Sequence, residues 1–115
     1  MQRTNFKMED SNITMIKGDT VAFNVIVYDS SESPMMVDSA YLTCKKVPSR
    51  EEIVFQKYLG NGITQENEMM SVRIAPEDTR DVDAGQYFYD LQIGVGSDIY
   101  TILNGSLQIT QDVTF

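Results

Sequence analysis

The chain has 115 residues, of which 42% are hydrophobic and 23% charged, so its length and composition are those of one globular domain. Its formal net charge of −8 argues against nucleic acid as a partner, because phosphate binding needs a stripe of basic side chains and the nine Lys and Arg residues are scattered. The absence of histidine removes the usual base near neutral pH and every Ser-His or Cys-His pair. Composition therefore predicts a protein that is not an enzyme and uses no cofactor.

Residues 1–11 are polar and show neither an alternating pattern nor a turn that would fold them back. They lack the apolar segment of a secretory signal peptide. No later run reaches the ~20 apolar residues that cross a bilayer. We therefore expect residues 1–11 to form a flexible N-terminal arm, residues 12–115 to form the domain, and no membrane to take part in its function.

Strict alternation of apolar and polar residues dominates the rest of the chain, and this is the pattern of half-buried β-strands. By this parity Phe88, Ile26 and Val54 face away from the core, which makes them candidate interface residues. The alternating segments are residues 20–29, 40–47, 52–59, 68–75, 86–95 and 98–110. The inward positions are Val21, Phe23, Val25, Val27, Ala40, Leu42, Cys44, Ile53, Phe55, Met70, Val72, Ile74, Tyr87, Tyr89, Leu91, Ile93, Leu103, Leu107 and Ile109, with Lys57 on the same parity.

Turn-forming residues separate these segments at residues 29–34, 47–52 and 60–62. A longer connection contains Pro76, Glu77 and Asp78, which suit the first turn of a short helix. About seven strands at this spacing predict an all-β fold, a single antiparallel β-sandwich. Because Cys44 is the only cysteine, the fold has no disulfide, and Cys44 is expected to be a small buried hydrophobe.

Asp83, Gly85 and Tyr87 follow the Asp-x-Gly-x-Tyr spacing of strand F in an immunoglobulin-like sandwich, and Tyr89 occupies the place of its disulfide cysteine. In such a tyrosine corner the phenol hydroxyl donates a hydrogen bond to backbone slightly upstream. Gly85 permits a positive φ at the bend, and Tyr89 faces the core, where its hydroxyl needs a partner. The motif predicts an immunoglobulin-like fold in which aromatic packing replaces the disulfide.

The acidic residues concentrate in the turns, where carboxylates are usually solvated. Asp81 and Asp83 are close enough in sequence to share a calcium ion, but the spacing of an EF-hand loop is absent, so no metal site is predicted. The acidic residues expected to be solvated are Asp29, Glu32, Glu51, Glu52, Glu77, Asp78, Asp81 and Asp83.

Three segments, residues 16–29, 74–93 and 100–114, carry motifs that occur in a recognisable order. The motifs are Gly18-Asp19-Thr20, Glu77-Asp78-Thr79, Gly85-Gln86-Tyr87-Phe88-Tyr89-Asp90, Thr101-Ile102-Leu103-Asn104-Gly105 and Asp112-Val113-Thr114. In these motifs the chain resembles the immunoglobulin-like domain of tailed-phage and prophage virion structural proteins, of the kind found at the N-terminus of upper-baseplate and tail-fibre proteins.

The resemblance implies a non-enzymatic virion protein, made in the bacterial host cytoplasm without disulfides, that contacts other virion proteins in many copies. Related proteins continue past this domain, whereas this chain stops at Phe115. We therefore expect an adaptor or decoration subunit of the tail, baseplate or capsid.

An alternative function is that of a carbohydrate- or receptor-binding module, in which exposed tyrosines would contact the ligand. Tyrosines available for this role are Tyr28, Tyr41, Tyr58 and Tyr100. In either case the negative charge opposes the packing of identical faces, which predicts a monomer or weak oligomer. Contacts are expected at open sheet edges, for which residues 13–16 and 107–110 are candidates.

Overall fold

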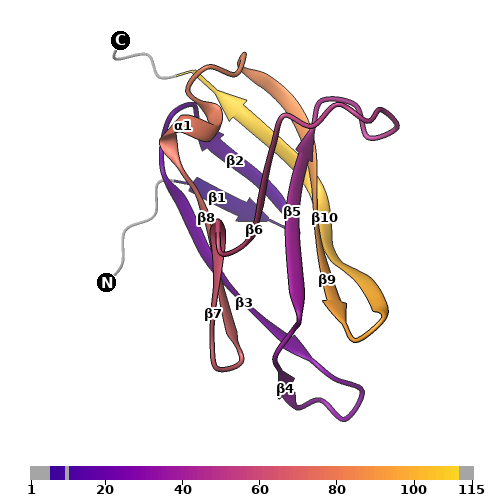
Figure 1. Ribbon diagram of the computed structural model, residues 1–115. Helices are drawn as coiled ribbons and strands as arrows, with labels where there is room; N and C mark the ends of the chain where they lie inside the picture. The colour runs from indigo at the N-terminus through magenta and orange to yellow at the C-terminus, as the bar shows by residue number, and fades with distance from the viewer. Residues whose placement is uncertain (1–5, 10, 112–115) are drawn as a thin grey trace.

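The computed structural model describes residues 6–9 and 11–111, and these form strands, short connections and one helical turn. The strands are β1 (Phe6–Glu9), β2 (Asn12–Ile16), β3 (Val21–Tyr28), β4 (Pro34–Met35), β5 (Ser39–Lys45), β6 (Phe55–Leu59), β7 (Gly62–Glu66), β8 (Met69–Ile74), β9 (Gly85–Val95) and β10 (Asp98–Thr110) (Figure 1). The helix α1 (Pro76–Thr79) begins at the expected proline. In the described part of the chain no helix is long and apolar enough to cross a membrane.

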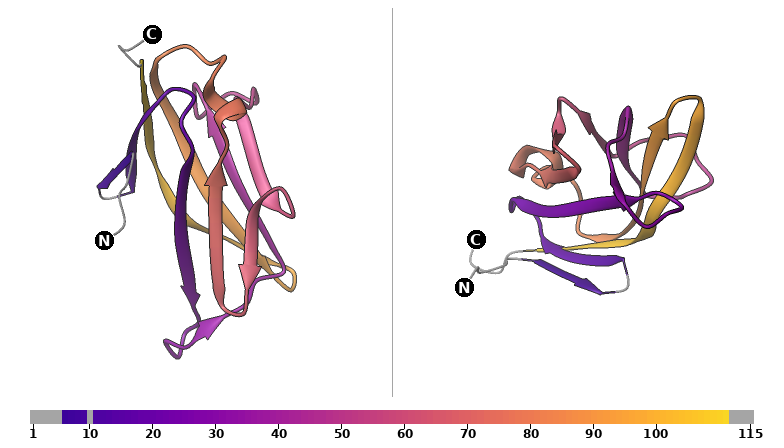
Figure 2. Two further views of the ribbon diagram at one scale, coloured as in Figure 1. Left: turned by 90° about the vertical axis from the view of Figure 1, so that its left-hand side faces the viewer. Right: turned by 90° about the horizontal axis from the view of Figure 1, so that it is seen from below.

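The strands form a continuous sheet in the order β1-β2-β10-β9-β5-β6-β7-β8-β3-β4. The sheet curls around a central core, as the view from below in Figure 2 shows. The prediction of an all-β fold is confirmed, but the prediction of about seven antiparallel strands is wrong. The described residues form ten strands, and β2 pairs with β10, and β6 with β7, in parallel. The alternating pattern did not predict β1, β4 and β7, because these strands are short and form by pairing with neighbouring strands.

A Gly-Asn-Gly turn carries the chain from β6 to β7, where the curled sheet passes from one layer to the other. Gly60 and Gly62 have φ angles of 96° and 91°, which residues with a Cβ rarely adopt. A Cβ at Gly62 would also lie 3.1 Å from the carbonyl oxygen of Arg73. The turn is closed by reciprocal backbone hydrogen bonds between Tyr58 and Asn61 at 2.9 and 2.8 Å.

Most inward positions that alternation predicts are buried in the core, but Phe23, Val25 and Leu103 are only half-buried against it. The core also contains Ile13, Met15, Val37 and Ile63, which alternation did not predict. Val21, Leu42, Val72 and Leu91 are fully or almost fully buried, as is Cys44. Ile53 is exposed instead. Val54, which we expected to face away from the core, is half-buried and packs against it. The outward direction expected of Val54 is therefore wrong, because residues 52–54 precede the strand and do not share its parity.

The first strand corrects the expected N-terminal arm. Phe6–Glu9 forms β1, which pairs antiparallel with β2 from Phe6 opposite Met15 to Glu9 opposite Asn12. Residues 6–9 are therefore part of the sheet. Residues 1–5 and 10 of the expected arm, and the Asp112-Val113-Thr114 motif, lie outside the described residues.

The expected sheet edges are also wrong. Residues 13–16 lie in β2, between β1 and β10. Residues 107–110 pair with β2, and 107–109 of them also pair with β9. The two terminal strands of the order are β1 and β4. Strands near the chain termini were expected at the margins, but the parallel pairing of β2 with β10 brings both into the interior of the sheet.

Candidate functional site

The outer face of β5, β9 and β10 is hollowed into a groove of about 470 Å³. The outward side chains of the three strands alternate with buried ones and point away from the core, whereas Tyr89, which also lines the groove, is itself a core residue. The strand register places Lys45, Phe88 and Ser106 in one row across the three strands. Thr43, Asp90 and Asn104 form the next row.

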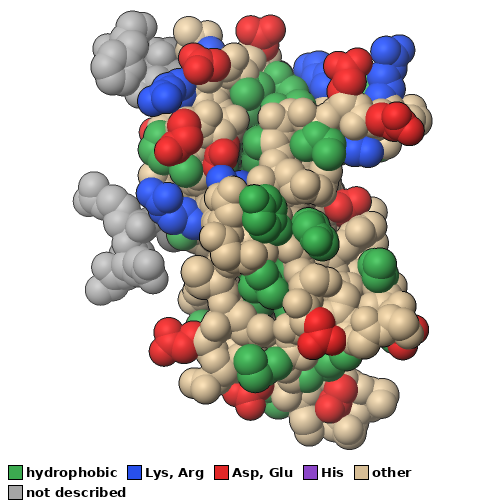
Figure 3. All heavy atoms as spheres, in the orientation of Figure 1, with side chains coloured by type: hydrophobic (Ala, Val, Ile, Leu, Met, Phe, Trp, Pro, Cys, Tyr) green, Lys and Arg blue, Asp and Glu red, His purple; other side chains and the backbone are tan. Residues whose placement is uncertain are grey.

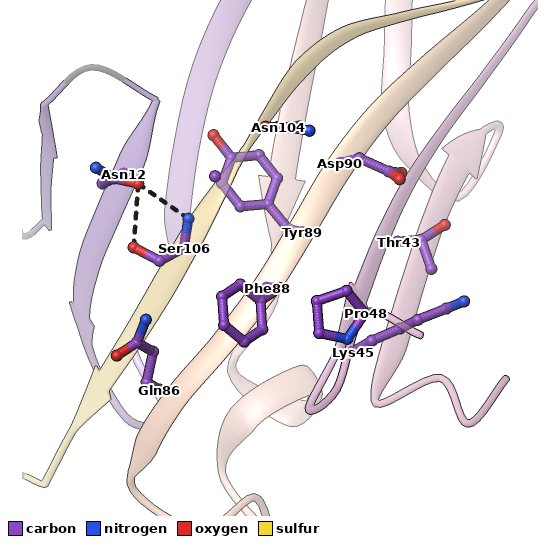
Figure 4. A pocket seen from close by; sticks show the side chains of 11 residues that line it. Asn12, Thr43, Lys45, Pro48, Gln86, Phe88, Tyr89, Asp90, Asn104 and Ser106 are labelled. Carbon is purple, nitrogen blue, oxygen red and sulfur yellow. Dashed lines mark hydrogen bonds between the residues drawn. The ribbon is translucent and has the colours of Figure 1, made fainter. Parts of the chain in front are cut away.

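Phe88 lies at the centre of this groove, as Figure 4 shows, and its ring is half-buried. On one side the wall is formed by Asn12 of β2, whose side-chain oxygen accepts hydrogen bonds from the Ser106 amide at 3.0 Å and hydroxyl at 3.1 Å. On the other side stands Pro48, from the connection that follows β5. The groove therefore combines segments that lie far apart in the sequence.

Tyr89 fixes the position of the β1–β2 turn beside the groove. Its hydroxyl donates a hydrogen bond to the Ser11 carbonyl oxygen at 2.5 Å. Gly105 lies opposite Tyr89 in register, and a Cβ at Gly105 would overlap that same carbonyl. Glycine at this position therefore allows the turn to cross β10 closely enough for Tyr89 to reach it. Burial raises the pKa of Tyr89, so its hydroxyl remains a donor at neutral pH.

The tyrosine corner lies next to the groove at the start of β9. The Tyr87 hydroxyl donates to the Asp83 carbonyl oxygen at 2.7 Å, which is the geometry expected of the motif. Gly85 between them has a φ of 153°. The Lys46 ammonium lies 4.5 Å from the centre of the Tyr87 ring, within the range of a cation–π contact. Burial, followed by the nearby Asp83 and Cys44, raises the pKa of Tyr87.

The chemistry that the groove offers is that of binding. Among the described residues that line it, Lys45 and Asp90 carry the charges, and the other side chains are amides, hydroxyls, Pro48 and aromatic rings. Cys44 lies beneath it but is fully buried, and burial raises its pKa to about 12. Its thiolate, the nucleophilic form, is therefore scarce at neutral pH. Among the described residues, no three His, Cys, Asp or Glu side chains come close enough to hold a metal ion.

The remaining candidate residues are distributed over other surfaces. Ile26 is exposed on β3, a strand that the sheet order separates from β9, so the structure does not bring it together with Phe88. Tyr41 and Tyr58 form an exposed cross-strand pair on β5 and β6, with ring centres 6.4 Å apart. Tyr28 and Tyr100 line a second pocket, at the opposite end of the molecule from α1.

One ion pair, between Lys57 and Asp78, was not predicted from the sequence. The Lys57 ammonium lies 2.8 and 3.0 Å from the two carboxylate oxygens of Asp78, and the two side chains are only 9% and 13% exposed. Asp78 also accepts a hydrogen bond from the Ala75 amide at 2.7 Å, at the start of α1. The expectation that Asp78 is solvated is therefore wrong. The inward parity of Lys57 was the sequence signal for this ion pair, because a buried ammonium requires a charged partner.

Comparison with known proteins bears on the fold. No protein-family model matches the chain, and no characterised protein matches it in sequence. Among solved structures, the swine CD8αα homodimer matches with a TM-score of 0.54 and 15% sequence identity, over 93% of this chain and 99% of that one. The chain has an immunoglobulin-like β-sandwich fold. The immunoglobulin-like fold class predicted from Asp83, Gly85 and Tyr87 is confirmed. At 15% sequence identity, the similarity to CD8 shows the fold alone.

Proposed function

We propose that this immunoglobulin-like domain is a non-enzymatic subunit of a tailed-phage or prophage virion. It binds another virion protein through the groove around Phe88, as an adaptor or decoration subunit of the tail, baseplate or capsid. Support for the virion assignment comes from the motifs in residues 16–29, 74–93 and 100–114. Support for docking comes from the groove.

The observation that carries the docking role is a half-buried aromatic ring surrounded by polar side chains. Protein interfaces have this composition, with aromatic residues at the centre and a polar rim. The walls are held before any partner arrives, by the hydrogen bonds from Ser106 to Asn12 and from Tyr89 to Ser11. A preorganised surface loses little conformational entropy when it binds.

The charge of the chain fits assembly on a larger scaffold. At a net charge of −8, identical copies repel one another, so the free chain is a monomer or weak oligomer that becomes ordered in many copies on a less acidic partner. With one cysteine it needs no oxidising compartment, in agreement with synthesis in the bacterial cytoplasm. Analytical ultracentrifugation checks this, and a stable dimer at nanomolar concentration would contradict it.

A particle-incorporation experiment tests the proposal. Phage particles are induced from the bacterial strain that encodes the chain, purified by density, and analysed for the chain by mass spectrometry. We expect the particles to contain the wild-type chain but not the Phe88→Glu variant. The matched control Ile26→Glu adds the same charge to an exposed position on the other layer, and we expect the particles to retain it. Circular dichroism shows whether both variants fold. Particles without the wild-type chain would refute the virion assignment, and retention of Phe88→Glu would refute docking through the groove.

The Tyr41–Tyr58 pair supports a second candidate function, carbohydrate binding. Both rings are exposed, at 45% and 42%, on the same outer face as the amide and hydroxyl groups of the groove. Sugars stack on such rings and form hydrogen bonds with such groups. A glycan array probed with the isolated chain distinguishes the two functions. Binding of a defined glycan that Tyr58→Ala abolishes would favour this second function.

A further inference from the structure

The two ends of the molecule differ sharply in charge. We call the end formed by residues 26–41, 64–70 and 91–103 the acidic end, because these ranges hold six carboxylates and no Lys or Arg. In Figure 3 the basic side chains lie in the upper half of the visible face, and the charged side chains of the lower half are all acidic. The six carboxylates are those of Asp29, Glu32, Asp38, Glu66, Glu68 and Asp98.

A second pocket, of about 590 Å³, lies at the acidic end, between the β3–β4 connection and the β9–β10 hairpin. Tyr28 and Tyr100 line it and are 58% and 52% exposed, so a ligand can reach both rings. Asp29 and Asp98 also line it. Its apolar side chains are Val27, Met35, Ile93, Val95 and Ile102. It shares no residue with the groove around Phe88.

The β3–β4 side of this pocket is held in place by Asp29. One carboxylate oxygen of Asp29 accepts hydrogen bonds from the Ser31 amide at 2.9 Å, the Ser31 hydroxyl at 3.0 Å and the Ser33 amide at 3.1 Å. The bonds from Ser33 and Ser31 lower the pKa of Asp29. The carboxylate is therefore charged at neutral pH while it closes the turn.

The β9–β10 side is tied to the residues before β5. The Asp38 carboxylate accepts a hydrogen bond from the Gly96 amide at 2.6 Å, and the Asp38 amide donates to the Gly94 carbonyl oxygen at 2.8 Å. Both sides of the pocket thus have defined positions without a ligand. This favours binding, because less conformational entropy is lost.

We infer that this pocket receives a basic side chain, arginine in preference to lysine, from a partner protein. Arginine has an aliphatic stem that can pack on the apolar residues, and a planar guanidinium that stacks on the Tyr28 or Tyr100 ring. The Asp98 carboxylate can then accept a charge-assisted hydrogen bond from it. The uniform negative charge of the acidic end attracts a basic partner surface and repels an acidic one. This inference is independent of what binds around Phe88.

A titration followed by nuclear magnetic resonance tests the inference on the full chain. The probe is the peptide acetyl-Gly-Arg-Gly-amide, and the matched control replaces arginine with citrulline, which has nearly the same shape but no charge. We expect the arginine peptide to shift the signals of Ile93, Val95 and Tyr100 with a Kd on the order of 1 mM. The citrulline peptide should bind at least about tenfold more weakly, since it lacks the charge-assisted hydrogen bonds. Added salt should weaken the arginine peptide's binding.

Four variants locate the site. Tyr100→Ala and Asp98→Asn should each weaken the arginine peptide about five- to tenfold, by removing a stacking ring or a charged acceptor. Tyr58→Ala and Asp81→Asn should leave it unchanged, because they remove an exposed ring or charge elsewhere. Equal binding of the citrulline peptide, shifts outside the pocket only, or equal weakening by Asp81→Asn would overturn the inference.

Discussion

The end of the sandwich that carries α1 and the acidic end are built from the same curled sheet, but the charged side chains that hold them differ in burial. At the α1 end, side chains connect segments far apart in the sequence. Lys57 pairs with Asp78, and the Gly18 amide donates to the Thr79 hydroxyl at 2.9 Å across 61 residues. At the acidic end, the hydrogen bonds of the Asp29 and Asp38 carboxylates are exposed: Asp29 accepts from Ser31 and Ser33, two and four residues away, and Asp38 accepts from the Gly96 amide, 58 residues away.

This difference implies that the two ends contribute differently to stability and to binding. Long-range contacts between buried groups raise the free energy of unfolding, because they exist only when the whole sheet is assembled. Local contacts in a turn mainly set the shape of that turn. The buried ion pair at the α1 end therefore contributes more to stability than the exposed turn around Asp29, and the acidic end places exposed rings and charges where a partner can reach them. Substitutions at the two ends should differ accordingly.

The largest effect is expected for Asp78→Ala at the α1 end. It leaves the Lys57 ammonium buried without a partner and removes the acceptor of the Ala75 amide. Breaking a buried pair in this way lowers the free energy of unfolding by about 3 kcal/mol or more. Urea denaturation measures it. The control Asp81→Ala removes a carboxylate that is 91% exposed and 4.0 Å from Arg80, and it should change stability by less than about 1 kcal/mol.

A smaller effect is expected for Tyr87→Phe, which removes the hydrogen bond to the Asp83 carbonyl. The cost should be about 1–3 kcal/mol, because the carbonyl loses its partner and the ring stays in place. Tyr28→Phe, at the acidic end, removes an exposed hydroxyl and should change stability by at most about 0.5 kcal/mol. Equal denaturation midpoints for Tyr87→Phe and the wild type would show that the corner does not stabilise the fold.

Asp29 provides a pH-dependent test of the acidic end. Hydrogen bonds from Ser33 and Ser31 lower its pKa below the ordinary value of 3.8. Folding therefore favours the charged form, so its contribution to stability is complete above pH 3.8 and is lost as the pH falls through the lower folded-state pKa. Asp29→Ala should be less stable than the wild type at neutral pH, and the difference should shrink in acid. A difference independent of pH would contradict this mechanism.

Cys44 should show the smallest response. It is fully buried and is the only cysteine in the chain, so reducing agent should leave the melting temperature unchanged. Iodoacetamide should label it only after unfolding, because burial raises its pKa to about 12 and excludes the reagent. Rapid labelling of the native chain would show that the sheet opens over β5.

Alternation predicted the core well, because a strand with one buried face must repeat every two residues. It correctly placed Met70, Val72 and Ile74 inward on β8. It failed for Val54, which lies just before a strand and follows no strand parity. It also carried no information on pairing partners, so the parallel contact of β2 with β10 was not foreseen.

The candidate site was predicted only in part. Parity gave the outward direction of Phe88, but the groove around it depends on Asn12 and Pro48, which come from other elements. Likewise, Tyr89 was expected to need a hydrogen-bond partner, yet its partner is Ser11, 78 residues away. Contacts of this kind depend on the tertiary arrangement and leave no local pattern in the sequence.

The joining of β2 to β10 also has a consequence for the order of folding. Asn12 and Ser106, whose hydrogen bonds cross this junction, are 94 residues apart in the chain. During synthesis the β1–β2 hairpin is made before the other described strands, but among these β10, the strand that it joins, is made last. Contacts at such sequence separation slow folding, because a long loop must close before they form. Of the described strands, β1 and β2 are therefore made before the others and yet are among the last to join the sheet.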